Sequence, residues 1–283
     1  MTEGLPPFSV LLPVYRGDRA EYLARAFDAA TVEQELRPDE VVIVRDGPVG
    51  PELAAELAAI RERAVVPVTL VELPENVGLA RALEVGLARC AHEVVARADA
   101  DDISLPRRFA EQLPVVAAGA DLVGTALVEF DDDEDVTGAL RVLPTDPDEI
   151  ARYARFADPF NHPSVVYRRS AVAAAGGYQD LHLMEDYLLF ARMIAHGARV
   201  ANLAEPLVKY RPGAGSYARR GGRALLRSEI SLQGTFRREG FTTALEAVRN
   251  VIVRGGYRLV PEAVRRLAYR SIILRPRAAK KES

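Results

Sequence analysis

Val94-Val95-Ala96-Arg97-Ala98-Asp99-Ala100-Asp101-Asp102 joins an apolar segment to an acidic cluster. The apolar, β-branched beginning predicts a buried strand, and this strand runs into three carboxylates within four residues. Neighbouring carboxylates repel each other and lose hydration at a sheet edge, so a hard cation between their oxygens would stabilise them. Mg²⁺ and Mn²⁺ commonly combine one or two carboxylates with substrate phosphates. The segment therefore predicts a divalent-metal site for a phosphorylated substrate. The alternative is a solvated acidic loop in which Asp102 or Ser104 caps the next helix.

Strands and helices alternate on both sides of this cluster. Before it, apolar strands are expected at 8–15, 40–46, 66–73 and 94–98, and helices at 21–34, 52–63 and 78–90. After it, helices are expected at 105–117, 146–156, 170–175 and 185–196, strands at 121–130, 164–168, 198–203 and 207–210, and an acidic loop at 131–135. Alternation of this kind predicts an α/β domain with a mostly parallel central sheet flanked by helices.

The composition is that of an ordinary globular protein, with 49% hydrophobic and 27% charged residues. Cys90 is the single cysteine of the 283 residues, which excludes an internal disulfide and fits a reducing cytosol. No signal peptide precedes the first strand, and no apolar run approaches the length of a membrane-spanning helix. We expect a cytoplasmic protein, with no nucleic-acid partner.

The charges are divided unevenly along the chain. From Arg219 to Ser283 there are 16 Lys and Arg against 5 Asp and Glu, whereas the preceding residues carry net negative charge. The residues from 223 onward follow a mostly helical pattern, in which Phe241, Leu245, Val248 and Ile252 recur at helical spacing. A basic amphipathic segment fits an anionic membrane surface, at the inner face of the cell membrane. The alternative is that these helices pack on the catalytic domain with their arginines solvated.

Two polar segments near strand ends could bind a nucleotide. Asp46 ends the second strand, where its carboxylate can accept hydrogen bonds from a base or ribose, although it could equally form a turn before Gly-Pro. Asn76 and Gly78 open a helix whose N-terminus favours phosphate, and Arg81 could reach the nucleotide; a plain Asn cap is the alternative. There is no Walker loop and no G-x-G-x-x-G, which disfavours ATPases and Rossmann dehydrogenases.

Carboxylates and cations recur in the second half of the chain. Glu185 and Asp186 begin a helix among apolar and aromatic neighbours, and such surroundings would raise the pKa of a carboxyl group that serves as a general base. Acidic residues in a first helical turn are also common dipole partners. His162 could contact an acceptor or lie in the core. The arginines Arg211, Arg219 and Arg220 could meet a diphosphate or be surface charges.

The order of these segments is more specific than any one of them. They are Leu-Pro-Val-Tyr (12–15), Val-Arg-Asp-Gly (44–47), Asn-Val-Gly-Leu-Ala-Arg (76–81), Arg-Ala-Asp-Ala-Asp-Asp (97–102), His-Pro-Ser-Val (162–165), Gly-Gly-Tyr (176–178), Glu-Asp-Tyr (185–187) and Tyr-Arg-Pro-Gly (210–213). From about Phe8 to about Arg220 the chain resembles the family 2 glycosyltransferases, which are inverting enzymes with the GT-A fold. Phe160-Asn-His-Pro and Ser216-Tyr-Ala-Arg-Arg-Gly-Gly222 further resemble bacterial amylovoran-type polysaccharide-biosynthesis transferases.

The resemblance implies a role for each matching residue. Asp101 would be the direct ligand of Mg²⁺ or Mn²⁺, Asp99 a second ligand or a ribose contact, and Asp102 a supporting residue. Asp186 would be the catalytic base, oriented by Glu185. The donor nucleotide sugar would meet Pro13, Val14, Tyr15, Asp46, Asn76, Gly78, Arg81, Arg97 and Asp99, and the acceptor His162, Tyr178, Tyr187 and Arg211. Residues 1–220 would form the catalytic domain, with a donor half at about 1–104 and an acceptor half at about 105–220, and 221–283 a basic helical extension.

These expectations amount to an inverting, metal-dependent transfer of a hexose from a nucleoside-diphosphate sugar, with a UDP-sugar as the expected donor. The expected acceptor is a lipid-linked saccharide in cell-surface polysaccharide biosynthesis. Two alternatives stay open. A nucleotidyltransferase acting on sugar phosphates would also use a strand-end acidic cluster, but residues 12–15 do not resemble its Gly-rich loop. A non-catalytic, glycan-binding relic of the fold is the other.

Overall fold

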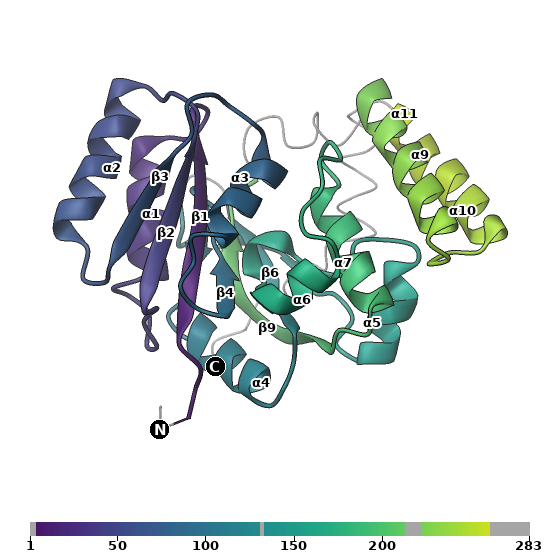
Figure 1. Cartoon of the computed structure of the whole chain (residues 1–283), viewed down its shortest axis with the longest axis horizontal. Helices are drawn as coiled ribbons and strands as arrows, with labels where there is room; N and C mark the ends of the chain where they lie inside the picture. Colours follow the sequence, from purple (N-terminus) through teal and green to yellow (C-terminus); the bar gives the residue numbers. More distant parts are fainter. Residues whose placement is uncertain (1–3, 131–132, 213–221, 261–283) are drawn as a thin grey trace.

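The computed structural model describes residues 4–130, 133–212 and 222–260. Within these residues, nine strands form one mixed sheet with the order β3-β2-β1-β4-β8-β6-β9-β5, and β7 pairs with β6 beside this path. Helices cover both faces of the sheet (Figure 1). The α/β architecture that the alternation of strands and helices predicts is confirmed.

The first half of the sheet is parallel. Strand β1 pairs with both β2 and β4, and β2 pairs with β3. Alternate residues of each strand face opposite layers, so that Val10 and Leu12 pack on one side and Leu11 on the other. The elements are β1 (Phe8–Tyr15), α1 (Ala20–Ala30), β2 (Glu40–Asp46), α2 (Pro51–Arg63), β3 (Val68–Glu72), α3 (Leu79–Leu87) and β4 (Val94–Arg97). Because β1, β2 and β4 run in parallel, their carboxyl ends meet at one edge of the sheet.

The second half adds antiparallel pairs around β6. Strand β6 pairs antiparallel with β7 and β8 and parallel with β9, while β8 pairs antiparallel with β4 and β5 with β9. The elements are β5 (Ile103–Ser104), α4 (Arg108–Ala117), β6 (Leu122–Phe130), β7 (Thr137–Arg141), α5 (Pro147–Ala154), the 3₁₀ turn η1 (His162–Ser164), β8 (Val166–Arg168), α6 (Arg169–Ala174), α7 (Glu185–Ala195) and β9 (Val200–Tyr210). Strand β9 thereby joins the segment after the acidic cluster to the rest of the second half.

Several local expectations differ from the structure. The two strands expected at 198–203 and 207–210 are one strand, β9, whose register against β6 shifts around Pro206. This irregularity accommodates the proline and lets the pairing continue, which an apolar pattern does not reveal. Helix α4 has Arg107 at its N-cap position without a side-chain cap, so the alternative in which Asp102 or Ser104 caps this helix is wrong.

The C-terminal helices pack against α7. They are α9 (Arg223–Arg238), α10 (Ala244–Asn250), the π-helix η2 (Val251–Gly255) and α11 (Gly256–Leu259). Leu232 and Phe236 of α9 are fully buried against Tyr187 and Leu188, and Figure 1 shows α9 and α10 beyond α7. None of the helices in the described ranges combines the length and the apolar character that crossing a membrane requires.

A buried arginine ties the end of β4 to the start of α4. Arg108 is 1% exposed, and its guanidinium donates to the Arg97 carbonyl (2.7 Å), the Ser104 hydroxyl (2.9 Å) and the Gln112 side chain (3.1 Å). Burial lowers the pKa of Arg108 to about 9. These bonds brace the acidic cluster from beneath.

Replacing Arg108 with Ala tests this brace. We expect Arg108→Ala to lower the free energy of unfolding by about 3 kcal/mol or more, because it leaves a cavity and several buried polar groups without partners. The control is Arg107→Ala, whose side chain is 53% exposed and forms surface ion pairs; its cost should be below about 1 kcal/mol. Urea unfolding of the two variants measures the difference, and equal costs would contradict the proposed brace.

Candidate active site

Asp46 organises the loop that leads into α3. The Asp46 carboxylate, at the end of β2, is buried, and it accepts hydrogen bonds from the Val77 amide (2.7 Å), the Asn76 side chain (2.9 Å) and the Gly78 amide (3.0 Å). Gly78 has a φ of +88° and open space where a Cβ would stand. The structure thus brings Asp46, Asn76 and Gly78 together, with Asp46 holding the loop in place.

The other expected nucleotide contacts have different surroundings. Tyr15 is 47% exposed at the end of β1, whereas Val14 lies in the core, Pro13 is half-buried and Arg81 is exposed on α3. A hollow of about 350 Å³ opens between the β1–α1 loop and the start of α2. It is lined by Arg16, Asp18, Arg19, Glu21, Glu52 and Leu53, among others.

Four carboxyl groups gather where β1 and β4 end. Asp102 is 5% exposed; burial raises its pKa well above the ordinary value, and the charges of Asp101 and Asp99 add to this. Its Oδ1 accepts a hydrogen bond from the Arg211 amide, while its buried Oδ2 has no hydrogen-bond partner. Asp18 accepts from the Tyr15 amide, and burial, with Asp101 and Asp99, raises its pKa to about 7.

Asp18 is a member of this cluster that the sequence analysis missed. It follows the first strand by three residues, so it stands at the same sheet edge as the residues after the fourth strand. The signal that could have found it is the rule used for Asp99: polar residues just beyond parallel strands converge.

Arg97 forms an ion pair with Asp99. The Arg97 side chain is 3% exposed, and its Nη1 lies 2.9 Å from Oδ1 of Asp99. Burial alone would lower the pKa of Arg97, but the charge of Asp99 and, to a smaller extent, that of Asp186 raise it. Arg97 therefore lies in the field of both carboxylates, between the acidic cluster and the start of α7.

The carboxyl groups of this cluster could hold a divalent cation whose other ligands come from a substrate phosphate and water. Among the described residues, no three side chains of the His, Cys, Asp or Glu type converge into a ready-made metal cage. The pKa values of Asp18 and Asp102 are nevertheless raised, by burial first and then by the charges of Asp101 and Asp99, and Oδ2 of Asp102 has no hydrogen-bond partner, which indicates negative charge that is not fully balanced. Mg²⁺ and Mn²⁺ are commonly held by one or two carboxylates, with phosphate oxygens and water completing the shell, so this donor set fits them.

Asp186 stands at the start of α7 with two partners. Its Oδ1 accepts a hydrogen bond from the Tyr187 amide (2.7 Å), and its Oδ2 lies 3.4 Å from Nδ1 of His162. Burial favours the neutral acid, but His162 and the Tyr187 amide outweigh it, and the pKa of Asp186 is lowered. The expectation that apolar surroundings raise this pKa is wrong for Asp186. It holds for Glu185, whose pKa burial and the charge of Asp186 raise to about 7.

His162 connects Asp186 to two tyrosines. Its Nε2 lies 2.9 Å from the Tyr178 hydroxyl, which in turn lies 3.5 Å from the Tyr167 hydroxyl. Burial and the charge of Arg97 lower the pKa of His162, which favours the neutral ring. A neutral ring satisfies both neighbours when Nδ1 carries the proton and faces Asp186.

Two of the residues expected at the acceptor lie elsewhere. The Tyr187 hydroxyl donates to the Ala154 carbonyl (2.8 Å), and its ring packs on Phe236. Arg211 lies at the acidic cluster, where its Nε donates to the Asp101 carbonyl. Arg219 and Arg220 lie outside the described residues.

Several known proteins are similar to this chain. The model of the family described as Glycosyl transferase family 2 matches residues 9–174. This chain belongs to glycosyltransferase family 2. The glycosyltransferase is 38% identical over 267 residues to the amylovoran biosynthesis glycosyltransferase AmsE of Erwinia amylovora, with 93% of this chain and 97% of the relative covered.

A second relative and a solved structure extend the comparison. The glycosyltransferase is 32% identical over 277 residues to the UDP-Gal:alpha-D-GlcNAc-diphosphoundecaprenol beta-1,3-galactosyltransferase of Escherichia coli, with 97% of this chain and 99% of the relative covered. The mannosyltransferase PcManGT of Pyrobaculum calidifontis, solved in complex with GDP-Man and Mn²⁺, superposes with a TM-score of 0.62 at 20% identity, over 95% of this chain and 76% of the other. The expected GT-A fold is confirmed, and the chain is a glycosyltransferase of polysaccharide biosynthesis.

The raised pKa of Glu185 makes the stability of this glycosyltransferase depend on pH. Because the folded state binds this proton more tightly than the unfolded chain, the group stabilises the fold at low pH. That stability is lost as pH rises from about 4.5 to about 7, by at most about 3 kcal/mol. Urea unfolding at pH 5 and pH 8 should show a smaller loss in Glu185→Gln, which lacks the ionisable group, than in the wild type. Identical losses in the two proteins would contradict the assignment.

Proposed function

We propose that the enzyme transfers a hexose, with inversion, from a nucleoside-diphosphate sugar to a lipid-linked saccharide, and that UDP is the nucleotide. One observation carries this proposal. The buried Arg97 lies in the electrostatic field of two acidic groups, the ionised Asp186 and the cluster of Asp99, Asp101 and Asp102, whose negative charge is not fully balanced. One side of this arrangement suits a metal-bound diphosphate. The other suits the removal of a proton from an acceptor hydroxyl.

The donor side would use residues of the first half of the chain. The loop held by Asp46 presents the start of α3, where a helix N-terminus favours phosphate. Asp101 and Asp99 would hold Mg²⁺ or Mn²⁺, which when bound offsets the negative charge that grows on the leaving diphosphate. The name of the E. coli relative specifies UDP-Gal, which supports UDP as the nucleotide here.

The acceptor side would use the second half. Asp186 accepts the proton of the acceptor hydroxyl as the hydroxyl oxygen bonds to the anomeric carbon. The bond from the anomeric carbon to the diphosphate oxygen breaks, and its electron pair leaves with the nucleoside diphosphate. Attack from the face opposite the leaving group inverts the configuration. His162 keeps Asp186 ionised at neutral pH, and the Tyr178 hydroxyl holds the His162 ring. Under this proposal the donor half is about 1–104 and the acceptor half about 105–220, except that Arg211 lies at the acidic cluster.

Replacing Asp186 with Asn tests the reaction. With a panel of UDP-sugars and a lipid-linked acceptor, we expect Asp186→Asn to lower turnover by about 100-fold or more, because the amide cannot accept the proton, while donor affinity stays near that of the wild type. Asp180→Asn, at an exposed aspartate nearby, should keep wild-type turnover.

The products separate the remaining alternatives. Release of UDP together with transfer of labelled sugar supports the proposal. Release of pyrophosphate would instead identify a nucleotidyltransferase, and wild-type protein that turns over no donor would be the glycan-binding relic. A loss in donor affinity, rather than turnover, would place Asp186 in the nucleotide site.

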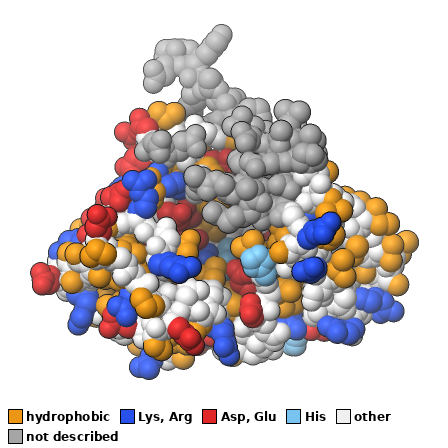
Figure 2. All heavy atoms as spheres, turned by 90° about the horizontal axis from the view of Figure 1, so that it is seen from above, with side chains coloured by type: hydrophobic (Ala, Val, Ile, Leu, Met, Phe, Trp, Pro, Cys, Tyr) orange, Lys and Arg blue, Asp and Glu red, His pale blue; other side chains and the backbone are white. Residues whose placement is uncertain are grey.

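The C-terminal helices would dock on an anionic membrane surface at the inner face of the cell membrane. Leu245, Val248 and Ile252 are 81%, 57% and 67% exposed. Val248 and Ile252 also line a shallow apolar groove of about 400 Å³ between α9 and the helices α10 and η2. Hydrophobic side chains gather at the right of Figure 2, on the side of α9 and α10 in Figure 1. Phe241, expected on this outer face, instead packs on Phe236 at 5.1 Å. The C-terminal residues Val264, Arg265, Arg266, Leu267, Arg270 and Ile272 lie outside the described residues.

Vesicle sedimentation tests this surface. We expect the wild type to pellet with anionic vesicles at low salt and to be released by high salt, because Arg side chains and apolar contacts act together. The double substitution Leu245→Asp and Ile252→Asp should abolish most of the binding. Val65→Asp, at a side chain that is 56% exposed in the loop between α2 and β3, should leave it unchanged. Binding that both variants retain would leave α9–α11 as a packing element alone.

A further inference from the structure

Arg211, the first residue after β9, reaches back to the acidic cluster. Its amide donates to Oδ1 of Asp102 (2.9 Å), and its side-chain Nε donates to the carbonyl oxygen of Asp101 (3.3 Å). One residue therefore holds both the side chain of Asp102 and the backbone of Asp101.

Two aromatic rings fix the Arg211 guanidinium. Its central carbon lies 4.0 Å from the ring centroid of Tyr22 on α1 and 4.3 Å from that of Phe130 at the end of β6. At these distances the planar cation is attracted to the ring faces. Phe130 is 1% exposed and packs with Ile103, the residue that follows Asp102.

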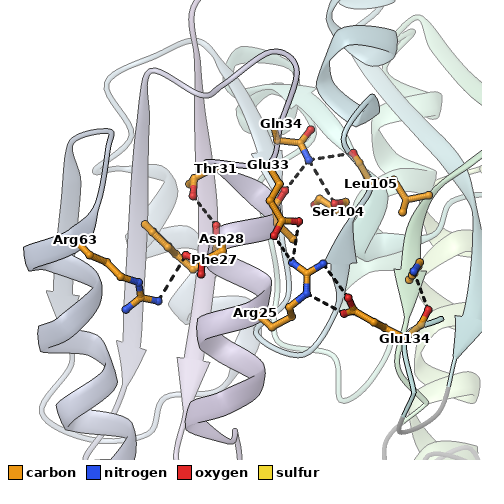
Figure 3. Close-up of polar contacts among 12 residues, drawn as sticks. Arg25, Phe27, Asp28, Thr31, Glu33, Gln34, Arg63, Ser104, Leu105 and Glu134 are labelled. Carbon is orange, nitrogen blue, oxygen red and sulfur yellow. Dashed lines mark hydrogen bonds and ion pairs between the residues drawn. The ribbon is translucent and has the colours of Figure 1, made fainter.

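The surrounding elements are cross-linked by charge. Arg25 of α1 donates to Glu33 (2.9 Å) and to Glu134 (2.8 Å), which follows β6, as Figure 3 shows. Lys209, two residues before Arg211, donates to the Glu134 carbonyl (2.7 Å). Helix α1 and the ends of β6 and β9 are thereby held together, so the position of Arg211 is set by three elements.

We propose that Arg211 is the positioning residue of the metal-binding loop: by holding the Asp101 carbonyl and the Asp102 carboxylate, it fixes the direction in which Asp101 presents its carboxylate. This inference rests on the proposed metal-dependent function. Groups that orient metal ligands through hydrogen bonds tune metal affinity without being ligands themselves. The competing role is direct contact between Arg211 and the donor diphosphate.

The experiment separates binding of metal from binding of nucleotide. Binding of Mn²⁺ in the presence of UDP is followed by the electron paramagnetic resonance signal of free Mn²⁺, and binding of UDP in EDTA by calorimetry. The variants are Arg211→Lys, which removes the planar group and Nε; Phe130→Leu, which removes one ring; and Asp101→Asn, which removes the proposed ligand. The control is Arg155→Lys, which changes an arginine that donates two hydrogen bonds to Glu246 of α10.

We expect Arg211→Lys to weaken Mn²⁺ binding by about 10- to 100-fold and to leave UDP binding in EDTA within about twofold of the wild type. Phe130→Leu should shift metal binding in the same direction by less, and it carries the test if Arg211→Lys does not fold. Arg155→Lys should match the wild type, and Asp101→Asn should bind no Mn²⁺.

Two results would overturn the positioning role alone. One is wild-type Mn²⁺ affinity in Arg211→Lys and Phe130→Leu while Asp101→Asn has lost it. The other is an equal loss of UDP binding in EDTA, which would make Arg211 a diphosphate contact. If the wild type with UDP binds no Mn²⁺, or Asp101→Asn binds it normally, the proposed metal site itself is wrong and the inference falls with it.

Discussion

The mutual repulsion of carboxylates at one sheet edge is the constraint around which this molecule is arranged. Asp18, Asp99, Asp101 and Asp102 stand within one another's field, and folding forces them together because β1 and β4 are neighbours in the sheet. Such proximity disfavours ionisation unless positive charge or hydrogen-bond donors balance it. The buried guanidiniums of Arg97 and Arg108 supply part of that balance from beneath. The remaining negative charge is what the proposed metal ion would offset.

A second arrangement of charges separates the two acidic neighbours at the start of α7. Glu185 and Asp186 are adjacent, yet burial raises the pKa of one, and His162 helps to lower that of the other. The two effects support each other. The charge of Asp186 favours the neutral form of Glu185, and a neutral Glu185 adds no negative charge beside Asp186. A carboxylate that is ionised and a carboxylic acid that holds its proton to about pH 7 offer different chemistry in consecutive residues.

The sequence predicts what periodicity and strand ends can reveal. The parallel strands, and the sheet edge at which Asp46 and Asp99 both lie, follow from apolar runs that stop at polar residues. The family follows from the order of these segments. Contacts between distant residues are a different matter. That Arg211 approaches Asp101, or that His162 lies beside Asp186, depends on how β9 and η1 are placed in the sheet, which no local pattern encodes.

Local chemistry also misled in identifiable ways. Apolar neighbours suggested a raised pKa for Asp186, because the sequence does not show the hydrogen-bond donors that reach its carboxylate. The family resemblance implied an acceptor contact for Tyr187, but its hydroxyl donates to the Ala154 carbonyl in the core. The two-residue strand β5 is too short to produce a pattern at all.

Helix α9 has one face against α7 and another face open beside α10. The buried Glu229 of α9 pairs with Arg254 of η2, whose guanidinium lies 5.2 Å from the ring centroid of Tyr187, the residue after Asp186. The open face and Asp186 thus lie on elements that pack directly against each other. A bilayer touching that face would hold Asp186 at a constant height above its headgroups. The distance of each hydroxyl of a membrane-tethered sugar from the bilayer would then decide which of them is attacked.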